Sequence, residues 1–137
     1  MSVWKIFTDG GSRSNPGAAA LGVWIVDETN QPVYSLGEYL GIKTNNEAEY
    51  EAFIRSAEWV VQQTNPPHSL EWYLDSQLVV QQLNKNWKIK EPRLQELAKQ
   101  AWHQLSSLKI PVKISYVPRE QNQEADALVN QALDSQA

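Results

Sequence analysis

The sequence predicts an α/β fold in which a mixed five-stranded sheet is flanked by helices. Three segments rich in β-branched and aromatic residues come first, with only short turns between them. After residue 46 the apolar residues change to helical spacing, and strand-like segments then alternate with helix-like ones. Short turns between neighbours indicate an antiparallel meander, whereas strands separated by helices indicate parallel pairing.

The three opening strands are expected over residues 2–9, 18–26 and 32–40, which read SVWKIFTD, AAALGVWIV and PVYSLGEYL. Valine, isoleucine and aromatic residues favour strands. The connections are too short for a parallel crossover, so these strands form the antiparallel part of the sheet.

The first helix is expected from Glu47 to Gln63, where apolar residues recur three and four positions apart. Thr44 or Asn45 is placed to cap its N-terminus. Carboxylates in the first turns of this helix suit the helix dipole.

The remaining elements alternate between strand and helix. A fourth strand over residues 70–75 is followed by a short helix from Ser76 to about Leu83, and a further helix starts near Pro92. A fifth strand over residues 111–117 precedes a last helix, whose expected inward residues are Ala125, Leu128, Val129 and Ala132.

Length and composition fit one globular domain over residues 1–137, with 42% apolar residues. The chain has no cysteine, which excludes disulfides, thiolate metal sites and thiol nucleophiles. No apolar run approaches membrane-spanning length and no signal segment is recognised, so we expect a cytoplasmic protein with no membrane partner. Nothing in the sequence demands more than a monomer.

The net charge of −4 argues against nucleic-acid binding by bulk charge alone. Residues 85–99 nevertheless contain five basic residues against two acidic ones. This segment either contacts a phosphate backbone or is a solvated helix with its lead-in.

Four acidic residues lie where predicted strands end or helices begin. Asp9 and Asp75 end the first and fourth strands, and Glu49 and Asp126 lie near the starts of the first and last helices. If those two strands are parallel neighbours, Asp9 and Asp75 converge at the sheet edge where ligands gather in α/β folds. Each acid also has a plain structural reading, as a turn residue, a helix cap, a helix start or a solvated helix residue.

Clustered carboxylates favour a bound cation, because they raise one another's pKa unless a positive charge lies between them. With no cysteine and two histidines far apart in the sequence, the ligands would all be oxygens, which favours Mg²⁺ or Mn²⁺ over zinc. Two such ions would activate a water and stabilise the leaving oxygen of a phosphodiester.

Four motifs follow one another along the chain: FTDGGSRSNPG, TNNEAEYEA, LDSQLVVQQLN and VPREQNQEADALVN. In order and spacing they resemble the type 1 ribonuclease H family, over nearly the whole chain. The resemblance implies a ribonuclease H-like fold and a metal-dependent endoribonuclease. Such an enzyme hydrolyses the RNA strand of RNA–DNA hybrids and leaves 3′-hydroxyl and 5′-phosphate ends. The resemblance assigns catalysis and the binding of two metal ions to Asp9, Glu49, Asp75 and Asp126. By the same resemblance, Glu47 faces solvent.

Selection of a hybrid needs groups that sense the RNA 2′-hydroxyl, and amides both donate and accept hydrogen bonds. The resemblance assigns such contacts to Asn15, Asn45, Asn46 and Gln77, and a phosphate of the DNA strand to Thr44. The other reading of the asparagines is capping and turn formation, which Asn15 also performs in its Asn-Pro-Gly turn.

The loop before the last acid departs from many bacterial members, which carry a histidine there. This chain has PREQNQ instead, and Arg119 is the candidate stand-in, as in the short-loop, archaeal-like members. A plain surface arginine is the other reading.

The region after Leu83 also differs from that of many bacterial members of the family, which have a basic helical protrusion there. In this chain NKNWKIKEPR leads directly into the next helix. Lys85, Trp87, Lys88 and Lys90 are candidates to replace it in part, with the indole against sugar and the lysines on phosphates. Trp87 would otherwise be a core or edge aromatic. The missing protrusion predicts weaker hybrid affinity with a steep salt dependence.

Two other functions stay open at this point. A catalytically silent hybrid-binding domain predicts the loss of one or more acids, and all four are present. A nuclease or transferase of the resolvase or integrase kind shares clustered acids but does not need the Asn-Asn and Asp-Ser-Gln amides. Cleavage of a hybrid, compared with duplex DNA and double-stranded RNA, distinguishes these readings.

Overall fold

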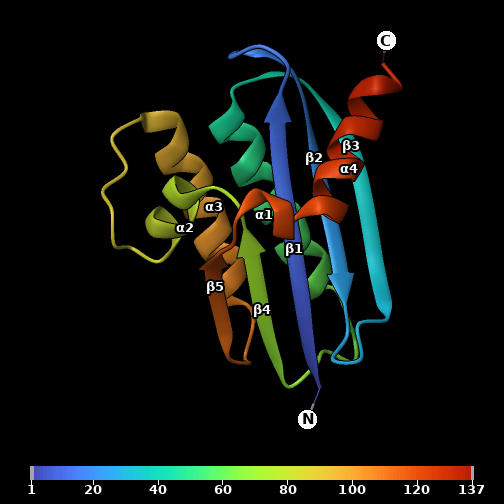
Figure 1. The fold of residues 1–137 in the computed structure, drawn as a ribbon. Helices are drawn as coiled ribbons and strands as arrows, with labels where there is room; N and C mark the ends of the chain where they lie inside the picture. The colour runs from blue at the N-terminus through green and yellow to red at the C-terminus, as the bar shows by residue number, and fades with distance from the viewer. Residues whose placement is uncertain (1, 137) are drawn as a thin grey trace.

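One five-stranded sheet with helices on both faces makes up the computed structural model, which describes residues 2–136 (Figure 1). The strands are β1 (Val3–Ser12), β2 (Gly17–Val26), β3 (Pro32–Lys43), β4 (Ser69–Leu74) and β5 (Val112–Tyr116). The helices are α1 (Asn45–Val61), α2 (Gln77–Leu83), α3 (Pro92–Ser106), the short 3₁₀ helix η1 (Arg119–Gln121) and α4 (Gln123–Asp134). The predicted α/β architecture is confirmed.

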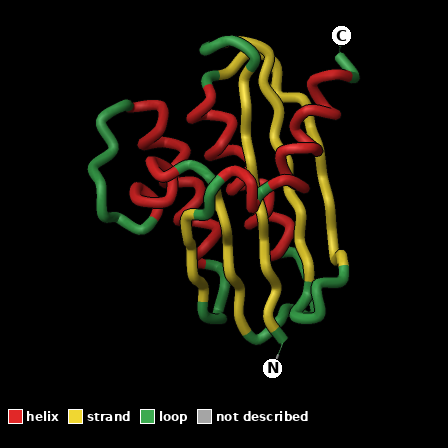
Figure 2. The backbone as a smooth tube through the Cα atoms, viewed as in Figure 1, coloured by secondary structure: helices red, strands yellow, loops and turns green. Residues whose placement is uncertain are grey.

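The sheet has the strand order β3-β2-β1-β4-β5 (Figure 2). β1, β2 and β3 pair antiparallel, as the short turns between them require. β4 pairs parallel with β1 and with β5, across helical connections. The pairing of β1 with β4 aligns Thr8 with Leu74, so the residues that follow these two positions lie side by side.

The two faces of the sheet are covered differently. α1 and α3 cover one face, and α4 crosses the upper part of the other (Figure 1). Alternate residues of the central strands, such as Ile6 in β1 and Trp72 in β4, point toward α1 and are fully buried there with Tyr50 and Phe53.

α4 lies directly on the sheet because glycines leave room for its backbone. A Cβ added at Gly22 would lie 2.3 Å from the carbonyl oxygen of Ala125, and one at Gly37 would lie 2.8 Å from that of Leu128. Any larger residue at these positions would push α4 outward. The two glycines therefore set the height of the helix that carries Asp126.

β1 is longer than the sequence predicted. It continues through Gly10 and Gly11 to Ser12, because these residues still pair with β2 after β4 has ended at Leu74. Asp9 therefore lies inside a strand rather than at its end, while Asp75 does follow its strand directly. Within residues 2–136, no helix is both long and apolar enough to span a bilayer.

Candidate active site

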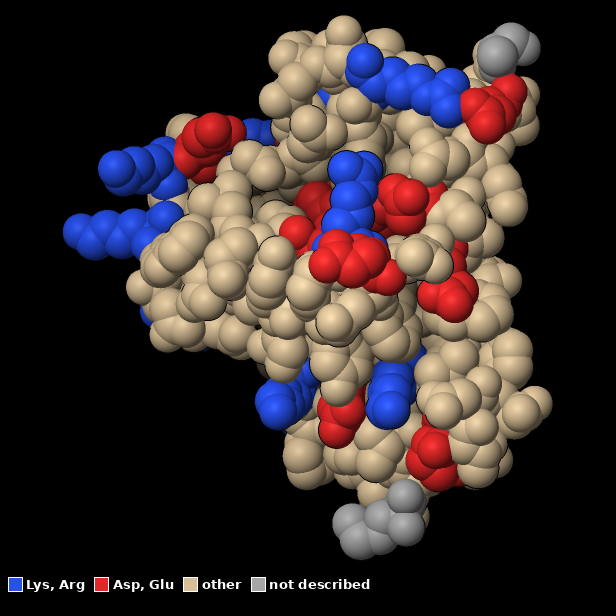
Figure 3. Space-filling view, viewed as in Figure 1, with Lys and Arg blue, Asp and Glu red and all other residues tan. Residues whose placement is uncertain are grey.

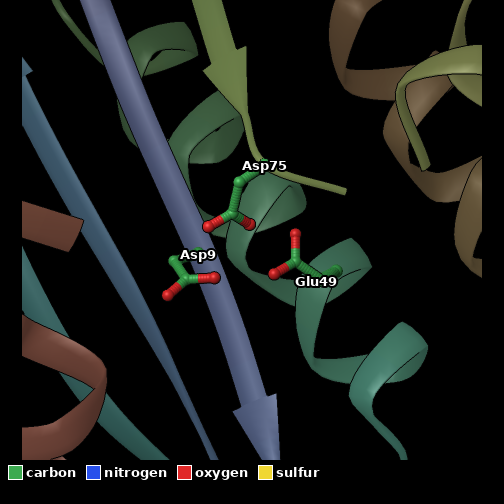
Figure 4. Close-up of side chains that lie close together, drawn as sticks. All are labelled: Asp9, Glu49 and Asp75. Carbon is green, nitrogen blue, oxygen red and sulfur yellow. The ribbon is translucent and has the colours of Figure 1, made fainter. Parts of the chain in front are cut away.

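Three carboxylates from three different elements point toward one another at the upper end of β4 (Figure 4). Asp9 comes from β1, Glu49 from the second turn of α1, and Asp75 from the residue after β4. One oxygen from each lies within 4.8 Å of the others. The N-cap of α2 is Ser76, so the reading of Asp75 as a helix cap is wrong.

A close contact between α1 and β1 places Glu49. A Cβ at Gly10 would lie 2.2 Å from the carbonyl carbon of Ala48, so only glycine lets the helix approach the strand this closely. The Gly10 N–H donates to Glu49 Oε1 at 2.8 Å. That bond orients the carboxylate toward Asp9 and Asp75.

The crowding of these acids raises their pKa values. Burial raises the pKa of Asp9 to about 7, with further increases from the charges of Asp75 and Asp126. Burial, followed by the charge of Asp9, raises the pKa of Glu49 well above its usual range. Burial also raises the pKa of Asp75, against the lowering effects of the Asn122 amide and Arg119. A cation bound among these carboxylates would lower their pKa values again, because it stabilises the ionised forms.

The donor set fits a hard divalent cation. Glu49 Oε2 is buried and has no hydrogen-bond partner among residues 2–136, which is costly unless something positive approaches it. The gathered ligand atoms are all carboxylate oxygens, with no histidine in the group. Oxygen-only sites suit Mg²⁺ and Mn²⁺.

Asp126 lies at the border of this cluster. Its charge and its hydrogen bonding raise the pKa of Asp9, so it is close to the three acids, although it is not among the carboxylates within 4.8 Å of one another. Arg119 Nη2 lies 3.6 Å from Asp126 Oδ1, and the Arg119 side chain is 80% exposed. Arg119 thus faces the acids across an open rim, rather than lying on an unrelated surface.

The acids open into a hollow of about 410 Å³. Its lining includes all four acids and Arg119, together with Arg13, Asn45 and Asn130. In the space-filling view, acidic side chains gather in a depression with basic groups among them (Figure 3). Because four carboxylates line this hollow, it would accept an anionic ligand such as a phosphodiester only with cations bound among the acids.

Hydrogen bonds join the β1–β2 turn to the start of α1, and they involve Asn15, Thr44 and Asn45. Thr44 is the N-cap, and its Oγ1 accepts from the Glu47 N–H at 3.1 Å. Asn15 Oδ1 accepts from the Asn45 N–H at 3.1 Å, and Asn45 Oδ1 accepts from the Ser12 N–H at 2.8 Å. Both amide oxygens are therefore engaged in the fold, so each side-chain NH₂ group is what remains to meet a ligand.

The other two predicted amide contacts lie at the starts of helices and are not among the residues that line the hollow. Asn46 is half-buried in the first turn of α1, and Gln77 is exposed at the start of α2, where it accepts from Gln81. The expectation that Glu47 faces solvent is wrong. Its side chain is 19% exposed, because it completes a capping box with Thr44 and pairs with Arg93.

The basic segment after α2 forms a separate surface. Lys85, Trp87 and Lys88 line a cavity of about 350 Å³ against α3, outside the hollow that holds the acids. Trp87 is 48% exposed, so it is not a core aromatic. Lys85, Lys88 and Lys90 are exposed as well.

Sequence reasoning missed three residues. Asn122 is fully buried, donates to the Thr8 carbonyl at 2.9 Å, and lowers the pKa of Asp75. Asn130 donates to the Asp126 carbonyl at 3.1 Å, and its four-residue spacing on α4 was a usable signal. Arg13 lines the hollow and pairs with Asp134, 121 residues away, a pairing that no local pattern predicts.

A family model and several known proteins match most of this chain. The family model described as "Reverse transcriptase-like" matches residues 7–132. A Halobacterium salinarum relative named "Ribonuclease HI" is 38% identical over 128 residues, which cover 93% of this chain and 63% of the relative. The Mycobacterium tuberculosis "Bifunctional protein Rv2228c" is 38% identical over 134 residues, 96% of this chain and 36% of that protein.

Solved structures of ribonucleases H have the same fold as this chain. The crystal structure of RNase H1 from Halobacterium salinarum NRC-1 has a TM-score of 0.90 and 37% identity, and the match covers 97% of this chain and 98% of that one. LC11-RNase H1, solved in complex with an RNA/DNA hybrid, has a TM-score of 0.89 and 37% identity, with 97% and 98% coverage. The chain spans about a third of the length of the mycobacterial relatives and about two thirds of the curated halobacterial one.

Proposed function

This chain belongs to the type 1 ribonuclease H family, and on that premise we propose that it is a metal-dependent endoribonuclease that hydrolyses the RNA strand of RNA–DNA hybrids. The observation that carries the proposal is the convergence of Asp9, Glu49 and Asp75 around an unpaired, buried carboxylate oxygen. The relative solved with a hybrid supports the choice of substrate.

The acids would hold two Mg²⁺ or Mn²⁺ ions, with Asp126 completing the set from α4. When bound, these ions supply an activated water and stabilise the leaving oxygen. Hydrolysis by water requires no covalent intermediate on the protein, and the expected products carry 3′-hydroxyl and 5′-phosphate ends. Asn122 is the N-cap residue of α4, and it would tie the start of this helix to β1 and to Asp75, because its amide donates to the Thr8 carbonyl and lowers the pKa of Asp75.

The amides would select the hybrid. The NH₂ groups of Asn15, Asn45 and Asn46, together with Gln77, are suited to meet 2′-hydroxyls and base edges. Thr44 accepts a bond from the helix, which leaves its hydroxyl proton to donate to a phosphate of the DNA strand. Lys85, Trp87 and Lys88 would extend the contact along the duplex.

Arg119 would act at the rim of the site. Its guanidinium lies near Asp126 and lowers the pKa of Asp75, so it favours the ionised carboxylates. It is also free to approach a phosphate, since most of its side chain is exposed.

Cleavage of an end-labelled RNA–DNA hybrid tests the proposal. The hybrid, duplex DNA and double-stranded RNA are each incubated with Mg²⁺, Mn²⁺ or EDTA, and Asp75→Asn is run in parallel. We expect cuts in the RNA strand of the hybrid that need a metal and vanish in the variant, with ends that a 3′-hydroxyl-dependent ligation detects. Hybrid binding without cutting under either metal would favour a silent binding domain, and cleavage of duplex DNA alone would exclude a ribonuclease H.

A further inference from the structure

The segment between α2 and α3, residues 84–91, has no regular secondary structure and yet carries the exposed basic side chains described above. Backbone groups outside helices and strands need other partners. For several backbone groups of this segment those partners come from residues of the two flanking helices, and the lysine and indole side chains stay exposed.

Two glutamine side chains, one from each flanking helix, donate to carbonyls of the segment. Gln95 Nε2 of α3 donates to the Ile89 carbonyl at 2.7 Å. Gln82 Nε2 of α2 donates to the Lys88 carbonyl at 3.4 Å. The two neighbouring carbonyls are thus held by two different helices.

The N-terminal half of the segment is held by α2. The backbone N–H groups of Asn86 and Trp87 both donate to the Gln81 carbonyl, at 2.9 and 3.3 Å. The Lys85 Nζ lies 4.9 Å from the ring centroid of Trp102 in α3, which restrains the start of the segment. The shape of the segment is therefore set before any ligand arrives.

Gln82 also connects this segment to the helix that carries Glu49. It is 4% exposed, and its Oε1 accepts from the Tyr50 hydroxyl at 2.7 Å. Because the Lys88 carbonyl can only accept, the opposite orientation of the amide would set two acceptors against each other. The amide therefore has one satisfied orientation, bridging α1 and the segment.

We propose that Gln82 and Gln95 are positioning residues for hybrid binding, which hold residues 84–91 in the shape that presents Lys85, Trp87 and Lys88 to the duplex. This inference rests on the function proposed above. A surface already in its bound shape loses less conformational freedom on binding, so the glutamines contribute to affinity without touching the substrate.

The test compares Gln82→Met and Gln95→Met with Gln100→Met, a control at an exposed position of the same helix as Gln95. We expect KM for the hybrid to rise about five-fold for each of the first two, the factor for one hydrogen bond of about 1 kcal/mol, with kcat within two-fold of the parent. The control should change neither constant. Amide hydrogen exchange should speed up within residues 84–91 only.

A second arm uses a parent in which Lys85 and Lys88 are both replaced by alanine. There Gln95→Met should raise KM by a smaller factor, because two of the three presented side chains are already lost. Gln95 is exposed, so this variant carries the test even if Gln82→Met folds poorly.

Unchanged KM in both glutamine variants would overturn the inference, as would an equal rise in the parent that lacks the lysines. Failure of the unsubstituted chain to bind or cut any hybrid would instead overturn the proposed function and remove the premise. The two failures are distinguishable, since the first occurs in a protein that cuts hybrids.

Discussion

Replacement of Asp9 by asparagine should stabilise the metal-free protein while abolishing hybrid cleavage. Asp9 is 6% exposed, and burial together with the nearby acids raises its pKa from 3.8 to about 7. The asparagine side chain has nearly the same shape and no charge. The substitution therefore removes the cost of a buried carboxylate and leaves the packing of β1 intact.

The direction in which stability changes with pH follows from proton binding by Asp9 in the native and unfolded states. Between about pH 4 and pH 7 the unfolded chain has released the Asp9 proton, whereas the native state keeps it, so the free energy of unfolding falls as the pH rises through this window. At about 1.36 kcal/mol per pKa unit, the cost of ionising Asp9 reaches an upper bound of about 4 kcal/mol above pH 7. We expect Asp9→Asn to gain about 2–4 kcal/mol at pH 8 and about 1 kcal/mol at pH 5.

Urea unfolding at pH 5 and pH 8 in EDTA measures these gains, with Asp27→Asn as the control. Asp27 lies in an exposed turn, where hydrogen bonds from Thr29 and Gln31 lower its pKa, so its replacement should bring no gain as the pH rises. Added Mg²⁺ should stabilise the parent more than Asp9→Asn, because a ligand that binds only the native state shifts the unfolding equilibrium.

Equal or lower stability of Asp9→Asn at pH 8 in EDTA would refute the argument that this carboxylate is held at a cost in the bare fold. A gain of the same size at both pH values would also refute it, since that result would point to packing rather than charge.

Three further outcomes are expected. Gly10→Ala should lower the free energy of unfolding in urea by about 3 kcal/mol or more, because the added Cβ would lie 2.2 Å from the α1 backbone. The control Gly11→Ala should cost less than about 1 kcal/mol, since the nearest atom to its Cβ is 3.4 Å away. Arg119→Ala should lower kcat/KM by about five-fold or less, since an exposed ion pair contributes at most about 1 kcal/mol. It should also shift the acidic limb of the pH–activity profile to higher pH, because loss of the guanidinium raises the pKa of Asp75. An unchanged profile would contradict this role. Replacing both Lys85 and Lys88 by alanine should raise KM for the hybrid and reduce the slope of log KM against log salt by about 2; an unchanged slope would remove this segment from the binding face.

The secondary structure and the identity of the acids were readable from the sequence. Helical spacing in α1 and the β-branched runs of β1 and β2 are local patterns, and the elements lie within a few residues of their predicted bounds. The end of β1 was misjudged, because the partner strand β2 keeps Gly10 and Gly11 extended where the Asp9-Gly10 dipeptide alone indicates a turn. Glu47 was misjudged because its ion pair with Arg93 joins residues 46 positions apart.

The site itself depends on contacts that no local pattern carries. Parallel pairing of β1 with β4 brings Asp9 beside Asp75, and the approach of α1 at Gly10 adds Glu49. The sequence by itself determined which residues are acidic, which segments form strands or helices, and which family they resemble, because side-chain period and motif order are properties of neighbouring residues. Only the tertiary structure decided which carboxylates meet, how deeply they are buried and how their pKa values shift, because these depend on strand partners and helix height that are set by packing across the whole fold.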